Sequence, residues 1–257
     1  MSLLDGLNYE EHGGGTQAPP LVFLHGAGGS RLHWPPGIRR LPGVHTFALD
    51  LPGHGKSAGG GETSIEDLAG RVEDWRRACA VFRPVFVGHS MGSAVALTMA
   101  LREPEGLTGL ILIGAGPRLQ VNPVLLEQTE RAETFTGAVE QILKWSFAPQ
   151  ASPRLVALAR RTMIRAGPAL LHRDLQACDA FDVAARLAEV RAPTLIIVGS
   201  QDRMTPPRLS QELHQGLVES RLQTIEGAGH MVMLERPEIV GHMLLAFCRE
   251  ISAVGGP

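Results

Sequence analysis

Ser90 stands at the centre of a pattern whose residue types could support nucleophilic chemistry. The pattern reads Gly-x-Ser-x-Gly over Gly88–Gly92 and directly follows the apolar run Val85–Val87. A sharp turn from a strand into a helix crowds the backbone and strains its central residue, and glycine relieves the clash because it lacks a Cβ. We therefore predict that Ser90 occupies a tight strand-to-helix turn, where its hydroxyl serves as a nucleophile.

A serine hydroxyl is almost wholly protonated at neutral pH, so it needs a general base, which in turn needs an orienting acid. Asp202 follows the apolar run Leu195–Gly199, and His230 follows a strand expected to end at Ile225, in a turn bracketed by glycines. Sites in parallel sheets are built at the carboxyl ends of strands. We predict Ser90 as nucleophile, Asp202 as acid and His230 as base.

Other side chains compete for these roles. His89 neighbours Ser90, but consecutive residues at a tight turn point in different directions, so we expect His89 to line the site or to pack beside it. Asp179 and Asp182 are rivals of Asp202, but they lie in a helical region without a preceding strand. We expect these two to be helix or hinge residues.

Attack on a carbonyl group also requires donors for the oxyanion that forms. The backbone N–H of Met91 follows the nucleophile at an expected helix N-terminus, where the helix dipole favours negative charge. A second donor is expected in the glycine-rich segment His25–Gly29, which follows an early apolar strand. Ala27 is the predicted donor there.

Short apolar runs alternate with helical patterns, which predicts an α/β fold with a mostly parallel central sheet flanked by helices. Thr63–Glu66 has the spacing of a helix capping box, Pro206 is expected in the first turn of a helix, and another helix should follow Pro237. The expected strands are Leu7–Glu11, Leu21–His25, His45–Leu49, Val85–Gly88, Gly109–Ile113, Thr194–Gly199 and Leu222–Ile225.

One long segment breaks this alternation. From Pro117 to Arg186 the sequence has helical pattern only, and a structureless loop of that length is improbable in a compact domain. We predict a core domain of residues 1–116 and 187–257, with residues 117–186 inserted as a helical cap. Its apolar residues either line a substrate pocket or dock the cap onto the core; the pocket candidates are Trp145, Phe147 and Phe135, with Trp145 the best placed.

Taken together, these motifs resemble those of the α/β-hydrolase superfamily, in its small capped esterase-like branch. The resemblance spans almost the whole chain, and it implies that Ser90, Asp202 and His230 form a catalytic triad and that Ala27 and Met91 form the oxyanion hole. It also implies a structural role for Asp50–Ser57 and a first edge strand that is short or missing here. The matching motifs are His25–Gly29, Asp50–Ser57, Gly88–Gly92, Pro193–Gly199 with Asp202, and Gly227–His230.

The resemblance implies a serine hydrolase that cleaves carboxylic esters, with a small acyl ester as substrate and no cofactor. A carbon–carbon bond hydrolase, a lactonase, a thioesterase or an acyltransferase would use the same triad, and some members of this fold are non-catalytic small-molecule binding proteins. Haloalkane dehalogenase and epoxide hydrolase relatives use an aspartate nucleophile, where this chain has Ser90.

Composition sets the remaining expectations. The 257 residues are 44% hydrophobic and 19% charged, and the net charge of −2 gives no reason to expect nucleic-acid or anionic-membrane binding. The three cysteines fit no zinc spacing and no disulfide framework, and no signal peptide or long apolar segment is evident. We expect a cytoplasmic protein without metal or membrane insertion, as a monomer or a homodimer.

Overall fold

The computed structural model describes residues 2–14 and 18–254. Within these residues, eight strands form one sheet in the order β1-β2-β4-β3-β5-β6-β7-β8. The pairs β1/β2 and β2/β4 are antiparallel and all other pairs are parallel, which confirms the predicted mostly parallel sheet. The strands are β1 (Ser2–Leu4), β2 (Leu7–His12), β3 (Leu21–Leu24), β4 (Thr46–Leu49), β5 (Val85–His89), β6 (Gly109–Ile113), β7 (Thr194–Gly199) and β8 (Ser220–Ile225). The edge strand, expected to be short or missing, is present and short: β1 has three residues.

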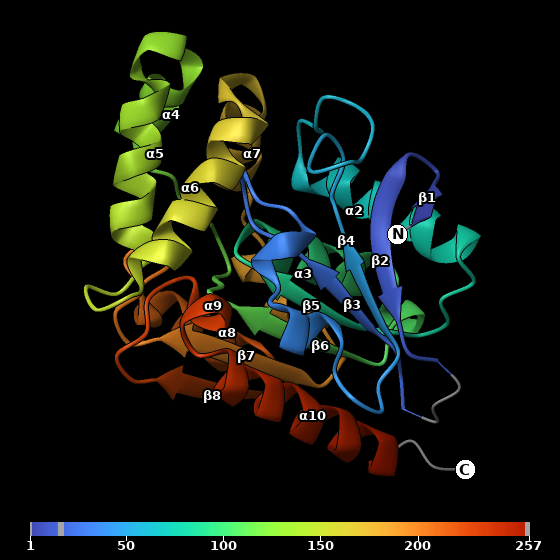
Figure 1. Cartoon of the computed structure of the whole chain (residues 1–257). Coiled ribbons are helices and arrows are strands. Elements are labelled where there is room, and N and C mark those ends of the chain that lie inside the picture. Colours follow the sequence, from blue (N-terminus) through green and yellow to red (C-terminus); the bar gives the residue numbers. More distant parts are fainter. Residues whose placement is uncertain (1, 15–17, 255–257) are drawn as a thin grey trace.

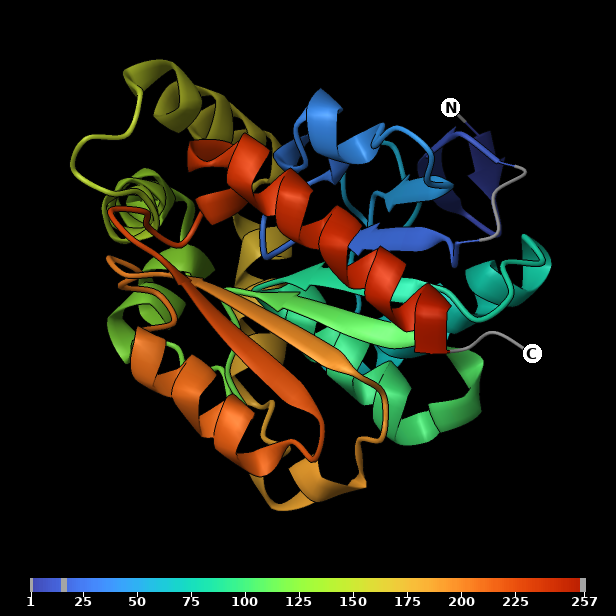
Figure 2. The same cartoon turned by 90° about the horizontal axis from the view of Figure 1, so that it is seen from below.

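The central strands are apolar throughout because helices cover both faces of the sheet. Alternate residues of β3 separate accordingly: Val22 and Leu24 join one core cluster, and Leu21 and Phe23 join the other. Helices α2 (Ile65–Ala78), α3 (Met91–Arg102) and α8 (Pro207–Gly216) pack in the first cluster. Helices α1 (Pro36–Arg39) and α10 (Pro237–Val254) pack in the second, and Figure 2 shows α10 running across the sheet.

Two helix starts differ from the prediction by one residue. The N-cap of α2 is Ser64, whose hydroxyl accepts a hydrogen bond from the backbone N–H of Asp67, so the capping pair is not Thr63 with Glu66. Helix α8 begins at Pro207, with Pro206 as its N-cap. In each case the neighbouring residue is of a similar type: Thr63 and Ser64 both suit an N-cap, and Pro206 and Pro207 both suit a helix start.

The segment between β6 and β7 is helical, as predicted, and stands at one side above the sheet in Figure 1. We call α4 to α7 the cap helices. That residues 117–186 form a separate inserted unit stays a prediction. The cap helices are α4 (Pro123–Glu130), α5 (Ala132–Ser146), α6 (Pro153–Ala166) and α7 (Pro168–Asp179); the remaining short elements are η1 (Arg31–His33), η2 (Pro104–Gly106), η3 (Ala184–Glu189) and α9 (Val232–Glu235).

In the described part of the chain, none of the helices combines the length and the apolar character that a membrane crossing requires.

Candidate active site

Ser90 occupies the tight turn between β5 and α3. Its backbone adopts φ +52° and ψ −117°, a strained conformation for a residue with a side chain, and its N–H donates to the carbonyl oxygen of Ile113 at 2.9 Å. A Cβ at Gly88 would lie 2.3 Å from the carbonyl oxygen of Gly92, and a Cβ at Gly92 would lie 2.2 Å from that of Leu24. Both glycines of the motif are therefore required by the close approach of backbone on each side of the serine.

Asp202 and His230 are in direct contact. Nδ1 of His230 lies 2.8 Å from Oδ2 of Asp202, and both residues are buried although they are 28 positions apart in the sequence. The loop after β7 supplies the carboxylate and the loop after β8 supplies the imidazole. A carboxylate can accept hydrogen bonds but cannot donate them. The contact therefore fixes the proton on Nδ1 of His230 and leaves Nε2 free to act as a base.

Three further donors hold the Asp202 carboxylate in place. Oδ1 accepts the backbone N–H groups of Met204 at 2.9 Å and Thr205 at 2.8 Å, and Oδ2 accepts the Thr205 hydroxyl at 2.9 Å. The Thr205 hydroxyl also lies 3.1 Å from Nδ1 of His230. Sequence reasoning missed Thr205, although an aspartate followed by Thr three positions later is a usual signal of a turn closed by side-chain hydrogen bonds.

His89 packs against His230, as expected, with ring centroids 4.6 Å apart. Burial and the neighbouring His230 hold the pKa of His89 well below its usual range, so the ring is neutral. Its Nε2 donates to the carbonyl oxygen of His230 at 3.1 Å and thereby supports the loop that carries the base.

The rival acids lie elsewhere. Asp179 accepts the backbone N–H of Val121, and Asp182 accepts that of Ala184; both aspartates are exposed. Neither has a hydrogen bond to His230.

The segment His25–Gly29 passes directly over Ser90. A Cβ at Gly26 would lie 3.1 Å from Cβ of Ser90 and 2.9 Å from Nδ1 of His89, so only glycine allows this approach. Ala27 lines the same cavity as Ser90, and Met91 is the first residue of α3. Neither the N–H of Ala27 nor that of Met91 donates to an acceptor within residues 2–14 and 18–254. Both groups are thus available to an oxyanion.

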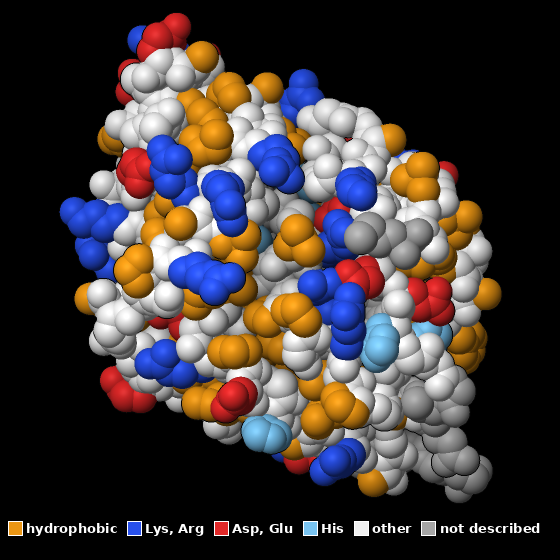
Figure 3. Space-filling model, viewed as in Figure 1, with side chains coloured by type: hydrophobic (Ala, Val, Ile, Leu, Met, Phe, Trp, Pro, Cys, Tyr) orange, Lys and Arg blue, Asp and Glu red, His pale blue; other side chains and the backbone are white. Residues whose placement is uncertain are grey.

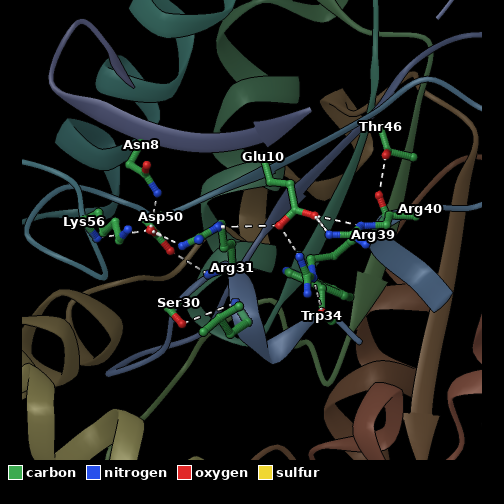
Figure 4. A network of polar contacts seen from close by, with 11 residues as sticks. Asn8, Glu10, Ser30, Arg31, Trp34, Arg39, Arg40, Thr46, Asp50 and Lys56 are labelled. Carbon is green, nitrogen blue, oxygen red and sulfur yellow. Dashed lines mark hydrogen bonds and ion pairs between the residues drawn. The ribbon is translucent and has the colours of Figure 1, made fainter. Parts of the chain in front are cut away.

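A buried polar network fixes the far end of this loop (Figure 4). The carboxylate of Asp50 accepts hydrogen bonds from the side chain of Asn8, from the backbone and guanidinium of Arg31, and from the backbone N–H of Lys56. Arg31 also pairs with Glu10. Asp50 therefore ties the start of η1 to the sheet, which agrees with a structural role for the motif Asp50–Ser57.

A cavity of about 460 Å³ lies between the core and the cap helices. Ser90 and His230 line it from the core, and Trp145 lines it from the cap. Phe135 and Phe147 are buried in a core cluster, however, and do not line the cavity. Further apolar lining from the cap helices includes Leu125, Ile142, Met163, Leu171, Leu175 and Cys178; polar lining includes Gln120, Asn122, Arg203 and Arg208.

On the face of the molecule shown in Figure 3, Lys and Arg side chains are spread over the upper part, with hydrophobic side chains between them.

In the described residues, no three His, Cys, Asp or Glu side chains gather in a way that would hold a metal ion.

Comparison with known proteins assigns the family. Residues 21–241 match the model of the alpha/beta hydrolase family. The chain belongs to this family. The matched alpha/beta hydrolase residues include Ser90, Asp202 and His230, together with the loop that carries Ala27.

Individual relatives span nearly the whole chain. A protein of Azorhizobium caulinodans, provisionally named carbamate hydrolase RutD, is 26% identical over 96% of both chains. A pimeloyl-[acyl-carrier protein] methyl ester esterase of Pectobacterium carotovorum is 28% identical over 89% of this chain and 94% of its own. The solved structure of a thermophilic esterase aligns with a TM-score of 0.81 and 29% identity, over 95% of this chain and 98% of its own. These similarities support a hydrolase of esterase type.

Proposed function

We propose that this alpha/beta hydrolase cleaves carboxylic esters through an acyl-enzyme on Ser90. The observation that carries the proposal is the buried 2.8 Å contact between His230 and Asp202, with His230 and Ser90 lining one cavity beneath the cap helices. A nucleophile, a base and an orienting acid are the groups that acyl transfer requires. The pimeloyl-[acyl-carrier protein] methyl ester esterase and the thermophilic esterase described above support the same class.

In the proposed reaction, Ser90 Oγ attacks the ester carbonyl carbon while Nε2 of His230 takes its proton. The N–H groups of Ala27 and Met91 donate to the resulting oxyanion. The tetrahedral intermediate collapses, the alcohol leaves with the proton from His230, and the acyl group stays on Ser90. Water then attacks the acyl-enzyme with His230 again as base, which releases the acid. Asp202 holds the imidazole in the required tautomer and stabilises its charged form.

A fluorophosphonate label tests nucleophile activation without knowledge of the natural substrate. We expect the label on Ser90 by peptide mass mapping, and we expect Ser90→Ala to abolish labelling and to lower kcat for p-nitrophenyl esters by several orders of magnitude. Ser152→Ala is a matched control, because Ser152 is exposed and makes no capping hydrogen bond. Labelling at another serine, or near-parental activity of folded Ser90→Ala, would refute the nucleophile assignment.

A substrate panel separates the reactions that share this triad. Esters, lactones, thioesters and vinylogous diketones distinguish an esterase from a lactonase, a thioesterase and a carbon–carbon bond hydrolase, and added alcohol acceptors reveal acyl transfer. Carbamates belong in the panel because a relative carries that name. Esters should give the highest kcat/KM. A carbamate or lactone whose kcat/KM exceeds that of the esters tenfold or more would reassign the substrate class. Stoichiometric binding without turnover would indicate a binding protein.

A further inference from the structure

A buried carboxylate of the cap touches the loop that carries the proposed oxyanion donor. Asp174 belongs to α7 and is 1% exposed. Its Oδ2 accepts the backbone N–H of Gly28 at 2.7 Å and lies 2.8 Å from Nε2 of His54. Gly28 directly follows Ala27. The cap therefore reaches the oxyanion loop through a hydrogen bond, and not by apolar packing alone.

The backbone at this contact has little freedom. Gly28 has φ +60°, and a Cβ there would lie 2.9 Å from Cδ1 of Leu171, also on α7. A hydrogen bond to the N–H of Gly28 fixes the plane of the peptide that joins it to Ala27. The orientation of that plane sets the backbone of Ala27, and with it the direction of the Ala27 N–H.

His54 supplies the charge that balances Asp174. Both ring nitrogens face acceptors: Nε2 faces Asp174, and Nδ1 lies 2.9 Å from the carbonyl oxygen of Pro52. A neutral imidazole has one N–H and would satisfy only one of them, so the ring carries two protons. Burial alone would lower the pKa of His54, but the Asp174 carboxylate outweighs it and the pKa is raised.

Two titratable groups beside this ion pair, His25 and Cys178, are uncharged. The His25 ring lies 4.7 Å from that of His54, and burial holds its pKa well below the usual range, so it is neutral. On the side of α7, burial keeps the Cys178 thiol protonated by raising its pKa. His54 is the cation in direct contact with the Asp174 carboxylate.

We infer that Asp174 is a positioning residue, which orients the oxyanion loop from the cap, and that His54 neutralises its charge so that it does not oppose the developing oxyanion. This inference rests on the proposed function of Ala27. A bare carboxylate beside the loop would repel negative charge in the transition state, and in a buried site this repulsion is strong.

The charges of this pair make a specific prediction for kcat. Asp174→Ala should lower kcat about tenfold, a fraction of the loss expected when an oxyanion donor is removed outright. His54→Gln should lower kcat further, because it leaves the carboxylate without its cation. The double variant Asp174→Asn with His54→Gln should recover at least threefold over His54→Gln alone. Asp174→Asn alone should be the mildest, since its amide oxygen still accepts from Gly28.

A purely structural role in holding the cap would give a different pattern. Inhibition by a trifluoromethyl ketone, whose adduct is a tetrahedral anion, should weaken in parallel with kcat, while KM for an ester changes less. The matched control is Arg173→Gln: Arg173 is the neighbour of Asp174 on α7 and donates to the carbonyl oxygen of Gly60, also across the boundary between cap and core. It should leave both kcat and inhibitor affinity within twofold of the parent.

Hydrogen exchange separates this inference from the proposed function. The amides of residues 26–29 should exchange faster in Asp174→Ala than in the parent, and their exchange rates should be unchanged in Arg173→Gln. Both expectations hold whatever reaction the protein catalyses. Unchanged exchange in Asp174→Ala overturns the positioning role. Equal kcat in His54→Gln and in the double variant, or losses confined to KM and melting temperature, overturns the electrostatic role. If Asp174→Ala does not fold, Asp174→Leu, which fills a similar volume and likewise lacks an acceptor for the Gly28 N–H, replaces it in this comparison.

Discussion

Nδ1 of His230 lies 2.8 Å from Oδ2 of Asp202, and this carboxylate accepts three further hydrogen bonds from the two residues Met204 and Thr205. The aspartate is therefore held rigidly, and it holds the imidazole in turn. The arrangement determines which ring nitrogen of His230 carries the proton before the substrate arrives.

Asp202→Asn should leave the fold intact and abolish most activity. An asparagine amide that donates toward Nδ1 would favour the wrong imidazole tautomer, and we expect kcat to fall about 10⁴-fold, with KM changed little. Steady-state kinetics with a p-nitrophenyl ester measures the loss. Asp182→Asn is the control, because Asp182 is exposed and its side chain accepts the backbone N–H of Ala184, away from His230. A fall of less than tenfold in Asp202→Asn would remove Asp202 from the triad.

Thr205→Val should reduce kcat by about tenfold, because a hydrogen bond to a charged group contributes about 1.5–3 kcal/mol. The valine keeps the shape of the side chain and loses the hydroxyl that donates to Asp202. Thr205→Ser restores the hydroxyl and should restore most of the rate. Equal kinetics in the valine and serine variants would show that the hydroxyl plays no part in holding the acid.

The sequence predicted the strands and the residues at their carboxyl ends because both depend on local patterns. The apolar run before Ser90 and the runs before Asp202 and His230 are strands in the structure, and the loops after β7 and β8 bring Asp202 and His230 together. These elements need no knowledge of the cap, since the parallel sheet alone brings strand ends to one edge.

The cap contacts could not be predicted in the same way. Asp174 and His54 are 120 positions apart and meet only because α7 packs over the loop after β4. The apolar character of Trp145 and Phe135 predicted that each would either line a pocket or dock the cap onto the core, but it did not decide between the two. Trp145 meets the cavity and Phe135 meets the core.

Trp145→Ala should shift the acyl-chain preference toward longer esters. Removal of the indole enlarges the cavity above Ser90, and each methylene that gains an apolar contact contributes about 1 kcal/mol. We expect the ratio of kcat/KM for octanoyl over butanoyl p-nitrophenyl esters to rise about tenfold. Phe135→Leu, on the same helix but away from the cavity, should lower the melting temperature and leave the ratio unchanged. An unchanged ratio in Trp145→Ala would count against a lining role.

Gly92→Ala and Gly137→Ala should have opposite effects on stability. A Cβ at Gly92 would lie 2.2 Å from the carbonyl oxygen of Leu24, whereas a Cβ at Gly137 meets nothing within 4 Å. We expect Gly92→Ala to cost more than ~3 kcal/mol or to prevent folding, because backbone atoms cannot move aside. Gly137 lies inside α5, where alanine is favoured over glycine by ~1 kcal/mol. Urea unfolding measures both, and a stable Gly92→Ala would contradict the close packing of the turn.

Acid should destabilise the protein between pH 6.5 and 4 through its buried neutral histidines. Burial, with a smaller contribution from His54, lowers the pKa of His33 to about 4, and burial also holds the pKa values of His25 and His89 well below their usual range. In the unfolded chain these histidines bind protons near pH 6.5, whereas in the folded protein they do not. Their contribution to the free energy of unfolding is therefore fully present above pH 6.5 and is lost as the pH falls. Each group contributes a slope of about 1.4 kcal/mol per pH unit.

His33→Phe should therefore flatten this pH dependence. Neither ring nitrogen of His33 has a hydrogen-bond partner in the described part of the chain, so phenylalanine removes the titration without breaking a bond. The difference in free energy of unfolding between pH 7 and pH 5 should shrink by about 2 kcal/mol, the share of one such histidine over this interval. Ile38→Val, a buried apolar change in α1, should lower stability by about 1 kcal/mol equally at both pH values. An identical pH dependence in His33→Phe and the parent would show that His33 binds a proton in the folded state as readily as in the unfolded one.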